Sequence, residues 1–267
     1  MTAERIDDAQ LDALEAVLRR ASGLALSPGM RRALPGAVRD AASAVRSAPA
    51  ELVRRILEGE PDAVMALVER TVVGETFFWR HPEQIALLAE LAFGADGPLY
   101  LWSAGCASGE EPYSLAMALL EAGRAGRGDR ILATDVSARG LSRARSATYG
   151  ARPLRRLPER LRARYLSGEP PGAEVVAEAR RLVSFSRNNL VADSPPSGPF
   201  DVVVCRNVLI YFDPVLAAEV LYRLVGATRP GGILVLGPVE LPIAQQVGLE
   251  WVDSGGASVL RRPLRGP

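Results

Sequence analysis

The chain has 267 residues, of which 48% are hydrophobic and 24% are charged. These values are ordinary for a globular protein and exclude a disordered tail, a collagen-like fibre and a coiled coil. No apolar run approaches the ~20 residues that a membrane span needs, and the acidic, amphipathic N-terminus does not resemble a secretory signal. The net charge of +1 gives no indication of nucleic-acid binding. We therefore expect a soluble, cytoplasmic protein that does not insert into a membrane.

The chain is poor in the residues of common catalytic and metal sites. Cys106 and Cys205 both stand in apolar stretches, so we expect buried thiols rather than a disulfide scaffold. His81 is the single histidine, which argues against Ser-His-Asp chemistry and against a histidine-rich metal site. We expect no metal.

Residues 1–72 are predicted to form a small helical domain. Apolar residues recur near helical spacing between breaks at Ser27-Pro28-Gly29, Ala48-Pro49 and Glu60-Pro61-Asp62. Residues 73–95 are predicted to link this domain to a second one, residues 96–267.

The second domain alternates short apolar strands with helices. Strands are expected at 99–102, 130–134, 200–205 and 232–236, with helices at 111–122, 136–147 and 214–227. Continuous apolar strands separated by helices are typical of parallel βαβ units in a doubly wound α/β sheet. Residues 250–252 and 258–261, on either side of Gly255-Gly256, predict a terminal antiparallel hairpin.

Residues 139–187 interrupt the alternation. Nine arginines and a single acid stand between residues 139 and 164, which indicates either a solvated helix face or a docking surface for an acidic partner. After a Gly- and Pro-rich turn at 168–172, residues 175–176 and 182–186 are expected to form a small antiparallel β insert, near 166–187.

The loop after the first strand carries the first sign of a ligand. Within residues 101–114, Gly105 and Gly109 permit sharp turns and close approach of a ligand to the main chain. The loop does not match the GxGxxG dinucleotide fingerprint, and Glu110 and Glu111 would repel a pyrophosphate. Carboxylates here favour a ligand with an ammonium or sulfonium group, hence S-adenosylmethionine over NAD. A simple capped helix start is the alternative.

Polar side chains follow the later strands. Asp135 ends the second strand, where an acid can accept hydrogen bonds from ribose hydroxyls; the competing role for Asp135 or Ser137 is a helix N-cap. Arg206-Asn207 and residues 188–190 also follow strands. Asparagine offers both a donor and an acceptor to an adenine edge or an amino group.

Several of these segments together resemble one known family. They are Thr76-Phe-Phe-Trp-Arg80-His-Pro-Glu83, Trp102-Ser-Ala-Gly-Cys-Ala-Ser-Gly-Glu-Glu-Pro-Tyr-Ser114, Asn189-Leu190, Cys205-Arg-Asn-Val-Leu-Ile-Tyr-Phe-Asp213 and Arg229-Pro-Gly-Gly232. In this order, over about residues 5–240, the chain resembles the chemotaxis receptor methyltransferases of the CheR family. The resemblance implies an N-terminal helical domain, a Rossmann-like class I methyltransferase sheet and a small antiparallel β insert. It also implies methyl transfer from S-adenosylmethionine to glutamates of chemoreceptors, which leaves S-adenosylhomocysteine.

The resemblance also implies site residues, some of them in the linker 73–95. The positions that match cofactor contacts of the family, together with Gly105 of the glycine loop, are Thr76, Arg80, Gly105, Glu110, Asp135, Asn189, Leu190, Asn207 and Val208. Two departures stand out. Gly74 replaces an asparagine that is frequent in the family, and Gly237-Pro-Val-Glu240 replaces its Gly-His-Ser-Glu.

The expected chemistry needs no general base, because a glutamate is already ionised near neutral pH. Catalysis would come mainly from alignment and desolvation. Arg80 would hold the carboxylate of the cofactor or of the substrate, and Tyr211 would line the methyl path, with plain aromatic packing as the alternative for Tyr211. Both are our predicted catalytic residues.

The predicted partner is the cytoplasmic helical region of chemoreceptors. Contact is expected through Arg152, Arg155, Arg156 and Arg160. An alternative function is a non-catalytic S-adenosylmethionine-binding sensor or scaffold in the same signalling system, suggested by the two departures. A methyltransferase for small molecules is disfavoured, because a small substrate needs neither the arginine-rich stretch nor a helical domain.

Overall fold

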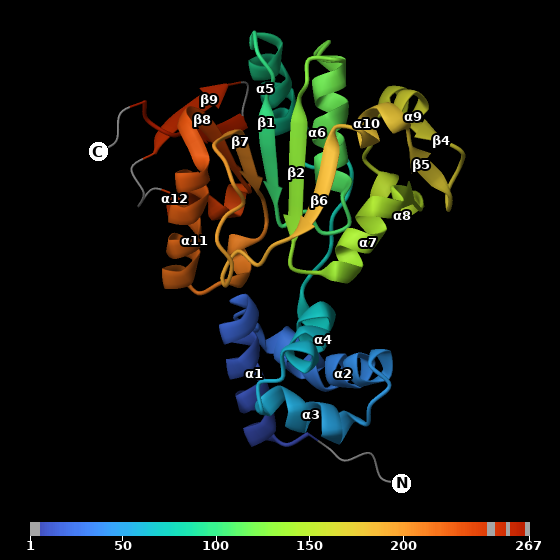
Figure 1. The fold of residues 1–267 in the computed structure, drawn as a ribbon, viewed down its shortest axis with the longest axis vertical. Helices are drawn as coiled ribbons and strands as arrows, with labels where there is room; N and C mark the ends of the chain where they lie inside the picture. The colour runs from blue at the N-terminus through green and yellow to red at the C-terminus, as the bar shows by residue number, and fades with distance from the viewer. Residues whose placement is uncertain (1–5, 245–248, 255–256, 265–267) are drawn as a thin grey trace.

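The computed structural model describes residues 6–244, 249–254 and 257–264. A helical domain at the N-terminus lies below the carboxyl ends of a central sheet (Figure 1). Its helices are α1 (Asp8–Ser22), α2 (Pro28–Ala44), α3 (Pro49–Leu57) and α4 (Pro61–Thr71).

Local signals set where these helices begin. The Asp7 side chain accepts a hydrogen bond from the backbone N–H of Gln10 (2.7 Å), and Ser27 does the same for Met30 (3.3 Å). Proline occupies the first turn of α2, α3 and α4, where its missing N–H costs nothing. The apolar faces of the four helices share one core, whose fully buried members include Leu14, Leu18, Leu34, Val38, Leu52, Ile56 and Leu67.

The second domain is built on a seven-stranded sheet with the order β6-β2-β1-β7-β8-β10-β9. The strands are β1 (Tyr100–Ala104), β2 (Arg130–Asp135), β6 (Val183–Arg187), β7 (Phe200–Cys205), β8 (Thr228–Leu236), β9 (Glu250–Ser254) and β10 (Ala257–Arg261). The first five in chain order pair in parallel, and β10 pairs antiparallel with β8 and β9. The predicted α/β class and the terminal hairpin are confirmed, with Gly255-Gly256 outside the described residues.

Sheet order places a ligand crevice beside β1. This strand pairs with β2 on one side and with β7 on the other, in the registers Trp102↔Leu132 and Trp102↔Val203. The chain therefore winds away from β1 in two directions, and ligands of open α/β sheets bind at such a reversal, beyond the carboxyl ends of the strands.

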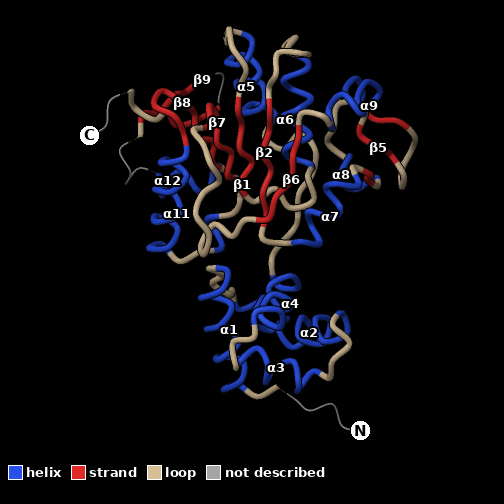
Figure 2. The backbone as a smooth tube through the Cα atoms, viewed as in Figure 1, coloured by secondary structure: helices blue, strands red, loops and turns tan. Residues whose placement is uncertain are grey.

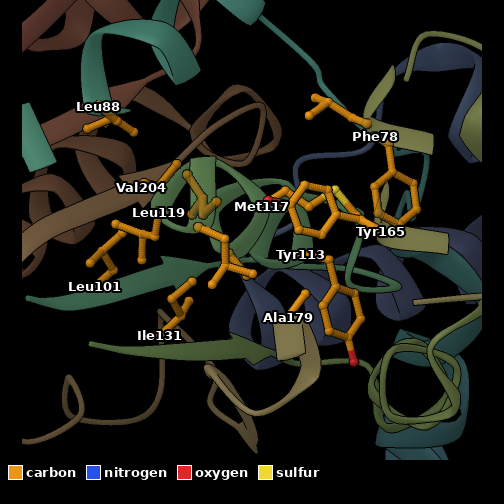
Figure 3. Packing of buried hydrophobic residues seen from close by; sticks show 14 of the residues in the cluster. Phe78, Leu88, Leu101, Tyr113, Met117, Leu119, Ile131, Tyr165, Ala179 and Val204 are labelled. Carbon is orange, nitrogen blue, oxygen red and sulfur yellow. The ribbon is translucent and has the colours of Figure 1, made fainter. Parts of the chain in front are cut away.

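Helices cover both faces of the sheet. They are α5 (Pro82–Phe93), α6 (Glu110–Glu121), α7 (Ala138–Ser146), α10 (Ala177–Arg180), α11 (Pro214–Ala227) and α12 (Leu241–Ala244), with short 3-10 turns at η1 (Leu209–Tyr211) and η2 (Pro238–Glu240). Figure 3 shows the core on one face, where Leu101 and Ile131 of the sheet pack with Met117 and Leu119 of α6. The sequence of α6 is apolar on all sides rather than amphipathic, and the helix is accordingly buried along nearly all of its length.

The β insert differs from the expectation. A second, three-stranded sheet has the order β3-β5-β4, formed by Thr148–Tyr149, Ala173–Val175 and Leu166–Ser167, with α8 (Ala151–Leu154) and α9 (Glu159–Tyr165) between its strands. The prediction that 182–186 belongs to this insert is wrong. These residues form most of β6, the edge strand of the main sheet, which pairs in parallel with β2. An edge strand buries one face only, so its alternating pattern is indistinguishable from that of an antiparallel strand.

Figure 2 shows strands in the second domain alone among the described residues. None of the described helices has the length and apolar character required to cross a membrane.

Candidate active site at the carboxyl ends of the strands

A cavity of about 620 Å³ lies at the carboxyl ends of β1, β2 and β7. Residues of the helical domain, among them Ser22, Leu24 and Glu69, form part of its wall. The cavity is lined by all of the predicted site residues except Glu110, namely Thr76, Arg80, Gly105, Asp135, Asn189, Leu190, Asn207, Val208 and Tyr211. Whether each of them contacts a ligand stays a prediction.

The loop after β1 requires glycine for a steric reason. Gly105 has a φ of +79°, and a Cβ there would stand 2.5 Å from Cγ2 of Val208. The backbone N–H groups of Gly105 and Cys106 donate to the Thr134 carbonyl, at 2.8 and 2.9 Å. These bonds hold the loop against the end of β2, so that Gly105 and Val208 form adjoining parts of the cavity wall.

The two acids at the start of α6 have different surroundings. Glu110 is buried, its carboxylate accepts a hydrogen bond from the Ser108 hydroxyl (2.8 Å), and it does not line the cavity. Burial raises the pKa of Glu110. Glu111 does line the cavity, where it accepts from the Ser103 hydroxyl (2.7 Å) and pairs with Arg206 (2.8 Å).

The sequence predicts both acids near a cationic ligand, and the resemblance to the family points to Glu110, which does not line the cavity. Adjacent helix residues point about 100° apart, and only the phase of the helix decides which one faces the strand ends. The apolar run after Glu111 hides that phase, because α6 is buried all round. Arg206 was noted as following a strand, but nothing in the sequence indicated its partner.

Asp135 stands at the end of β2 with its carboxylate fixed by the main chain. Its two oxygens accept hydrogen bonds from the N–H groups of Ala107 and Ser137, both at 2.8 Å. Burial raises the pKa of Asp135, and these N–H groups act in the opposite direction. The helix cap of α7 is provided by Ser137, whose hydroxyl accepts from Gly140 N–H (3.0 Å). Asp135 therefore keeps lone pairs for a hydroxyl-bearing ligand.

The segment after β6 lines the cavity and is hydrogen-bonded to the helical domain. The Asn189 amide donates to the Ala21 carbonyl (2.6 Å), and its oxygen accepts from Val191 N–H (3.0 Å). Asn189 lines the cavity with its amide already engaged. The neighbouring Asn188 also lines it, and the side-chain oxygen of Asn188 is buried with no hydrogen-bond partner among the described residues.

A second contact between the domains supports the same wall. Glu69, on α4, accepts hydrogen bonds from the hydroxyl of Ser137 and from the N–H of Ala138, at the start of α7. The Ala25 N–H donates to the Tyr211 carbonyl (2.8 Å). The helical domain is thus joined both to the end of β2 and to the loop after β7.

The loop after β7 is held by a carboxylate that sequence reasoning missed. Glu240 is fully buried, and it accepts hydrogen bonds from the N–H groups of Asn207, Val208, Leu209 and Gly237, at 2.7 to 2.8 Å. Burial raises the pKa of Glu240, while these four donors lower it. Although the residues before Glu240 depart from the family pattern, this acid is present.

Thr76 and Arg80 form the wall that precedes α5, and both are half-buried. Burial and the nearby charge of Arg206 lower the pKa of Arg80. Gly74 is exposed, and a Cβ there would meet nothing within 4 Å, so crowding does not explain the glycine. The neighbouring Glu75 lines the cavity and pairs with Arg152 (2.8 Å) at an exposed position.

Tyr211 occupies η1 beside the cavity and is half-buried, which raises the pKa of its hydroxyl. Its position fits both of the roles considered from the sequence, a lining of the methyl path and aromatic packing. His81 Nδ1 lies 3.3 Å from the Glu83 carboxylate, burial lowers the pKa of its imidazole, and the residue does not line the cavity.

The arginine-rich stretch is partly neutralised within the chain. Arg160 and Arg164 pair with Glu121, Arg162 with Glu169, and Arg152 with Glu75. Two of its arginines reach the cavity wall. The guanidinium carbons of Arg155 and Arg156 lie 4.3 and 5.1 Å from the ring centre of Phe77, and Phe77 lines the cavity.

The cavity fits S-adenosylmethionine by its unpartnered polar atoms. The buried side-chain atoms that lack a hydrogen-bond partner among the described residues are Asn188 Oδ1, Arg206 Nη2 and Asn207 Oδ1. All three residues line this one cavity. Because buried polar atoms are rarely left unpaired, these atoms indicate a polar ligand that accepts one hydrogen bond and donates others.

The sheet, the crevice beside β1 and the polar cavity are those of a class I S-adenosylmethionine-dependent methyltransferase domain. The family model "CheR methyltransferase, SAM binding domain" matches residues 74–249. The chain belongs to the CheR methyltransferase family.

Named relatives agree with this assignment. The chain is 36% identical to the "Probable biofilm formation methyltransferase WspC" of Pseudomonas aeruginosa, over 96% of this chain and 63% of the relative. It is 38% identical to "Chemotaxis protein methyltransferase 1" of the same organism, over 71% of this chain and 74% of the relative. Relatives named WspC are longer: the matches span 63% of the length of one and 47% of another.

Among solved structures, the N-methyltransferase NodS from Bradyrhizobium japonicum, in complex with S-adenosylhomocysteine, is similar at 17% identity and a TM-score of 0.42, over 68% of this chain and 87% of that one.

Proposed function

We propose that this chain transfers a methyl group from S-adenosylmethionine to glutamate carboxylates of chemoreceptors, in the cytoplasm, giving glutamate methyl esters. The observation that carries the proposal is the set of unpartnered polar atoms of Asn188, Arg206 and Asn207, gathered in one cavity of a CheR-family chain. The names of the chemotaxis methyltransferases among its relatives support the substrate class.

S-adenosylmethionine, when bound, supplies a methyl group on a positively charged sulfur. Asp135 is the residue we expect at the ribose, and Asn188 and Asn207 are expected at the polar edges of the ligand. Arg80 and Arg206 offer positive charge to carboxylates.

The receptor glutamate needs no proton removed, because it is ionised near neutral pH. A carboxylate oxygen forms the new bond to carbon, and the electron pair of the broken carbon–sulfur bond stays on sulfur. The chain contributes by alignment and by excluding water, for which effective molarity is worth up to about 7–11 kcal/mol. The absence of His81 from the cavity wall is consistent with a reaction that uses no general base.

We further propose that the receptor docks on the arginine-rich stretch, through Arg152, Arg155, Arg156 and Arg160. Arg155 and Arg156 contact Phe77 at the cavity wall, so an acidic helix held there would present its glutamates close to the cavity. Arg152 and Arg160 are exposed in their ion pairs with Glu75 and Glu121. Exposed ion pairs contribute little to stability, so these arginines can exchange their partners for an acidic group of the receptor.

The test is a methylation assay with chemoreceptor membranes and S-adenosylmethionine carrying a radiolabelled methyl group. The proposal expects label in the receptor that mild base releases as methanol. If S-adenosylhomocysteine binds in calorimetry but no base-labile ester forms, the protein is the non-catalytic binding module instead.

Charge reversal tests the docking surface separately. The variant R152E/R155E/R156E should lose receptor methylation and keep its affinity for S-adenosylhomocysteine. A control is R127E/R130E, which reverses two charges away from the docking surface, because Arg130 begins β2 at the end remote from the cavity. Equal activity of both variants at physiological salt would rule out this surface.

A further inference from the structure

Arg206 has a bonding pattern unlike that of Arg124, which is also deeply buried. Its Nε pairs with Glu111 (2.8 Å), and its Nη1 donates to the Arg80 carbonyl (2.6 Å) and to Gln84 (3.3 Å). The residue is 6% exposed, yet Nη2 has no hydrogen-bond partner in the described part of the chain. Arg124, which is 2% exposed, has partners on Nε, Nη1 and Nη2. An unsatisfied donor of a buried guanidinium is costly, so Nη2 marks a position for an acceptor.

The charges around Arg206 indicate which kind of acceptor belongs there. Arg80 lines the same cavity, and its guanidinium forms no hydrogen bond or ion pair within the described part of the chain. Glu111 is the acid that pairs with Arg206, and its other oxygen accepts the Ser103 hydroxyl. Arg80, Arg206 and Glu111 together carry one excess positive charge at this part of the cavity wall. Guanidinium groups bind carboxylates through paired, charge-assisted hydrogen bonds.

We propose that Arg206, through Nη2, binds a carboxylate together with Arg80, and that Glu111 and Gln84 are positioning residues that hold the guanidinium in place. This inference rests on the proposed function, since that reaction brings two carboxylates to the cavity. One belongs to the amino-acid end of S-adenosylmethionine, and the other is the side chain of the receptor glutamate. The chemistry of recognition is the same for both.

Calorimetry with two ligands and an activity assay distinguish the two sources. Arg206→Lys keeps the charge but loses the fork of donors. S-adenosylhomocysteine carries the carboxylate, whereas 5′-methylthioadenosine has the same nucleoside and thioether but lacks the whole amino-acid end, carboxylate and ammonium together. If Arg206 binds the cofactor carboxylate, the variant should lose about tenfold or more in affinity for S-adenosylhomocysteine and keep its affinity for 5′-methylthioadenosine.

If Arg206 binds the substrate carboxylate, both affinities should stay unchanged, while kcat/KM for receptor methylation falls about tenfold or more. Arg124→Lys is the matched control, because it alters a buried arginine that does not line the cavity; it should lower thermal stability and leave both affinities intact. Glu111→Gln should reproduce part of the Arg206→Lys effect.

Two results would overturn the inference. One is an equal loss of affinity for both ligands, which indicates a structural role. The other is an Arg206→Lys variant with unaltered affinities and unaltered methylation. A failure of the proposed function is recognisable separately: the unmodified protein would bind S-adenosylhomocysteine and form no ester.

Discussion

The carboxylate of Glu240 accepts a hydrogen bond from the backbone N–H of Asn207 at 2.8 Å. Asn207 adopts a left-handed conformation with a φ of +61°, which asparagine tolerates better than most residues. The bond joins the end of β8 to the loop after β7, so the position of a cavity residue depends on a buried acid that itself lies outside the cavity wall.

Glu240→Gln is expected to destabilise this loop. The amide has an NH2 donor in place of one carboxylate oxygen. This donor would face backbone N–H groups that now donate hydrogen bonds to Glu240. We expect a loss of about 1–3 kcal/mol in the free energy of unfolding, measured by urea denaturation, and weaker binding of S-adenosylhomocysteine. Glu219→Gln, at an exposed position on α11, should change neither; an equally mild effect at Glu240 would contradict this account.

Asp135→Asn is expected to weaken cofactor binding. The amide keeps an acceptor for one of the two backbone N–H groups and places a donor against the other. It also loses the charge that would accept ribose hydroxyls. We expect a loss of about 1–3 kcal/mol in the free energy of binding S-adenosylhomocysteine, measured by calorimetry. Unchanged affinity would count against a ribose role for Asp135.

Gly105→Ala should be harmful because the backbone and the space both require glycine. The φ of +79° disfavours a Cβ, and the added carbon would stand 2.5 Å from Val208. We expect a loss of about 1–3 kcal/mol in stability, together with reduced affinity for S-adenosylhomocysteine. Gly226→Ala is the control, since Gly226 lies within α11 with nothing within 4 Å of a Cβ; it should gain about 0.5–1 kcal/mol. Similar changes in both variants would refute the steric argument.

The pH dependence of stability should reveal the buried Glu110. Burial raises its pKa in the folded protein above the usual value of 4.5, so the folded state holds this proton to higher pH than the unfolded chain does. The contribution of Glu110 to stability is therefore present at low pH, and it is lost as the pH rises from about 4.5 through the raised pKa.

Glu110→Gln lacks this proton equilibrium, while Asp135 and Glu240 titrate in both proteins. The free energy of unfolding of the variant, relative to that of the unmodified protein, should increase between pH 4 and pH 7. The increase should be about 1.4 kcal/mol for each unit by which the Glu110 pKa differs between the folded and unfolded states, measured by urea denaturation at each pH. Parallel stability curves for the two proteins would show that Glu110 is not desolvated.

Much of the sheet was readable from the sequence. The strand at 200–205 and the helix at 214–227 coincide with β7 and α11, because their apolar runs are bounded by turn residues and by Asp213-Pro214. The β6 strand was misassigned, since pairing with β2 is a long-range contact that leaves no local mark. The cavity is lined by Glu111 rather than by Glu110, and the sequence does not show this because a helix that is buried on all sides does not reveal which way each residue faces.

By itself, the sequence determined β1, β2, β7 and β8 and the strand-end positions of the polar residues, because hydrophobic periodicity and turn chemistry act over a few neighbouring residues. Tertiary structure alone decided which of those residues share a cavity and which polar atoms are left unpaired. Arg206 with Glu111, Asn207 with Glu240 and Asn189 with Ala21 are brought together by packing across β1, β7, β8 and the helical domain. Contacts at such separations depend on how whole elements pack, which no short segment encodes.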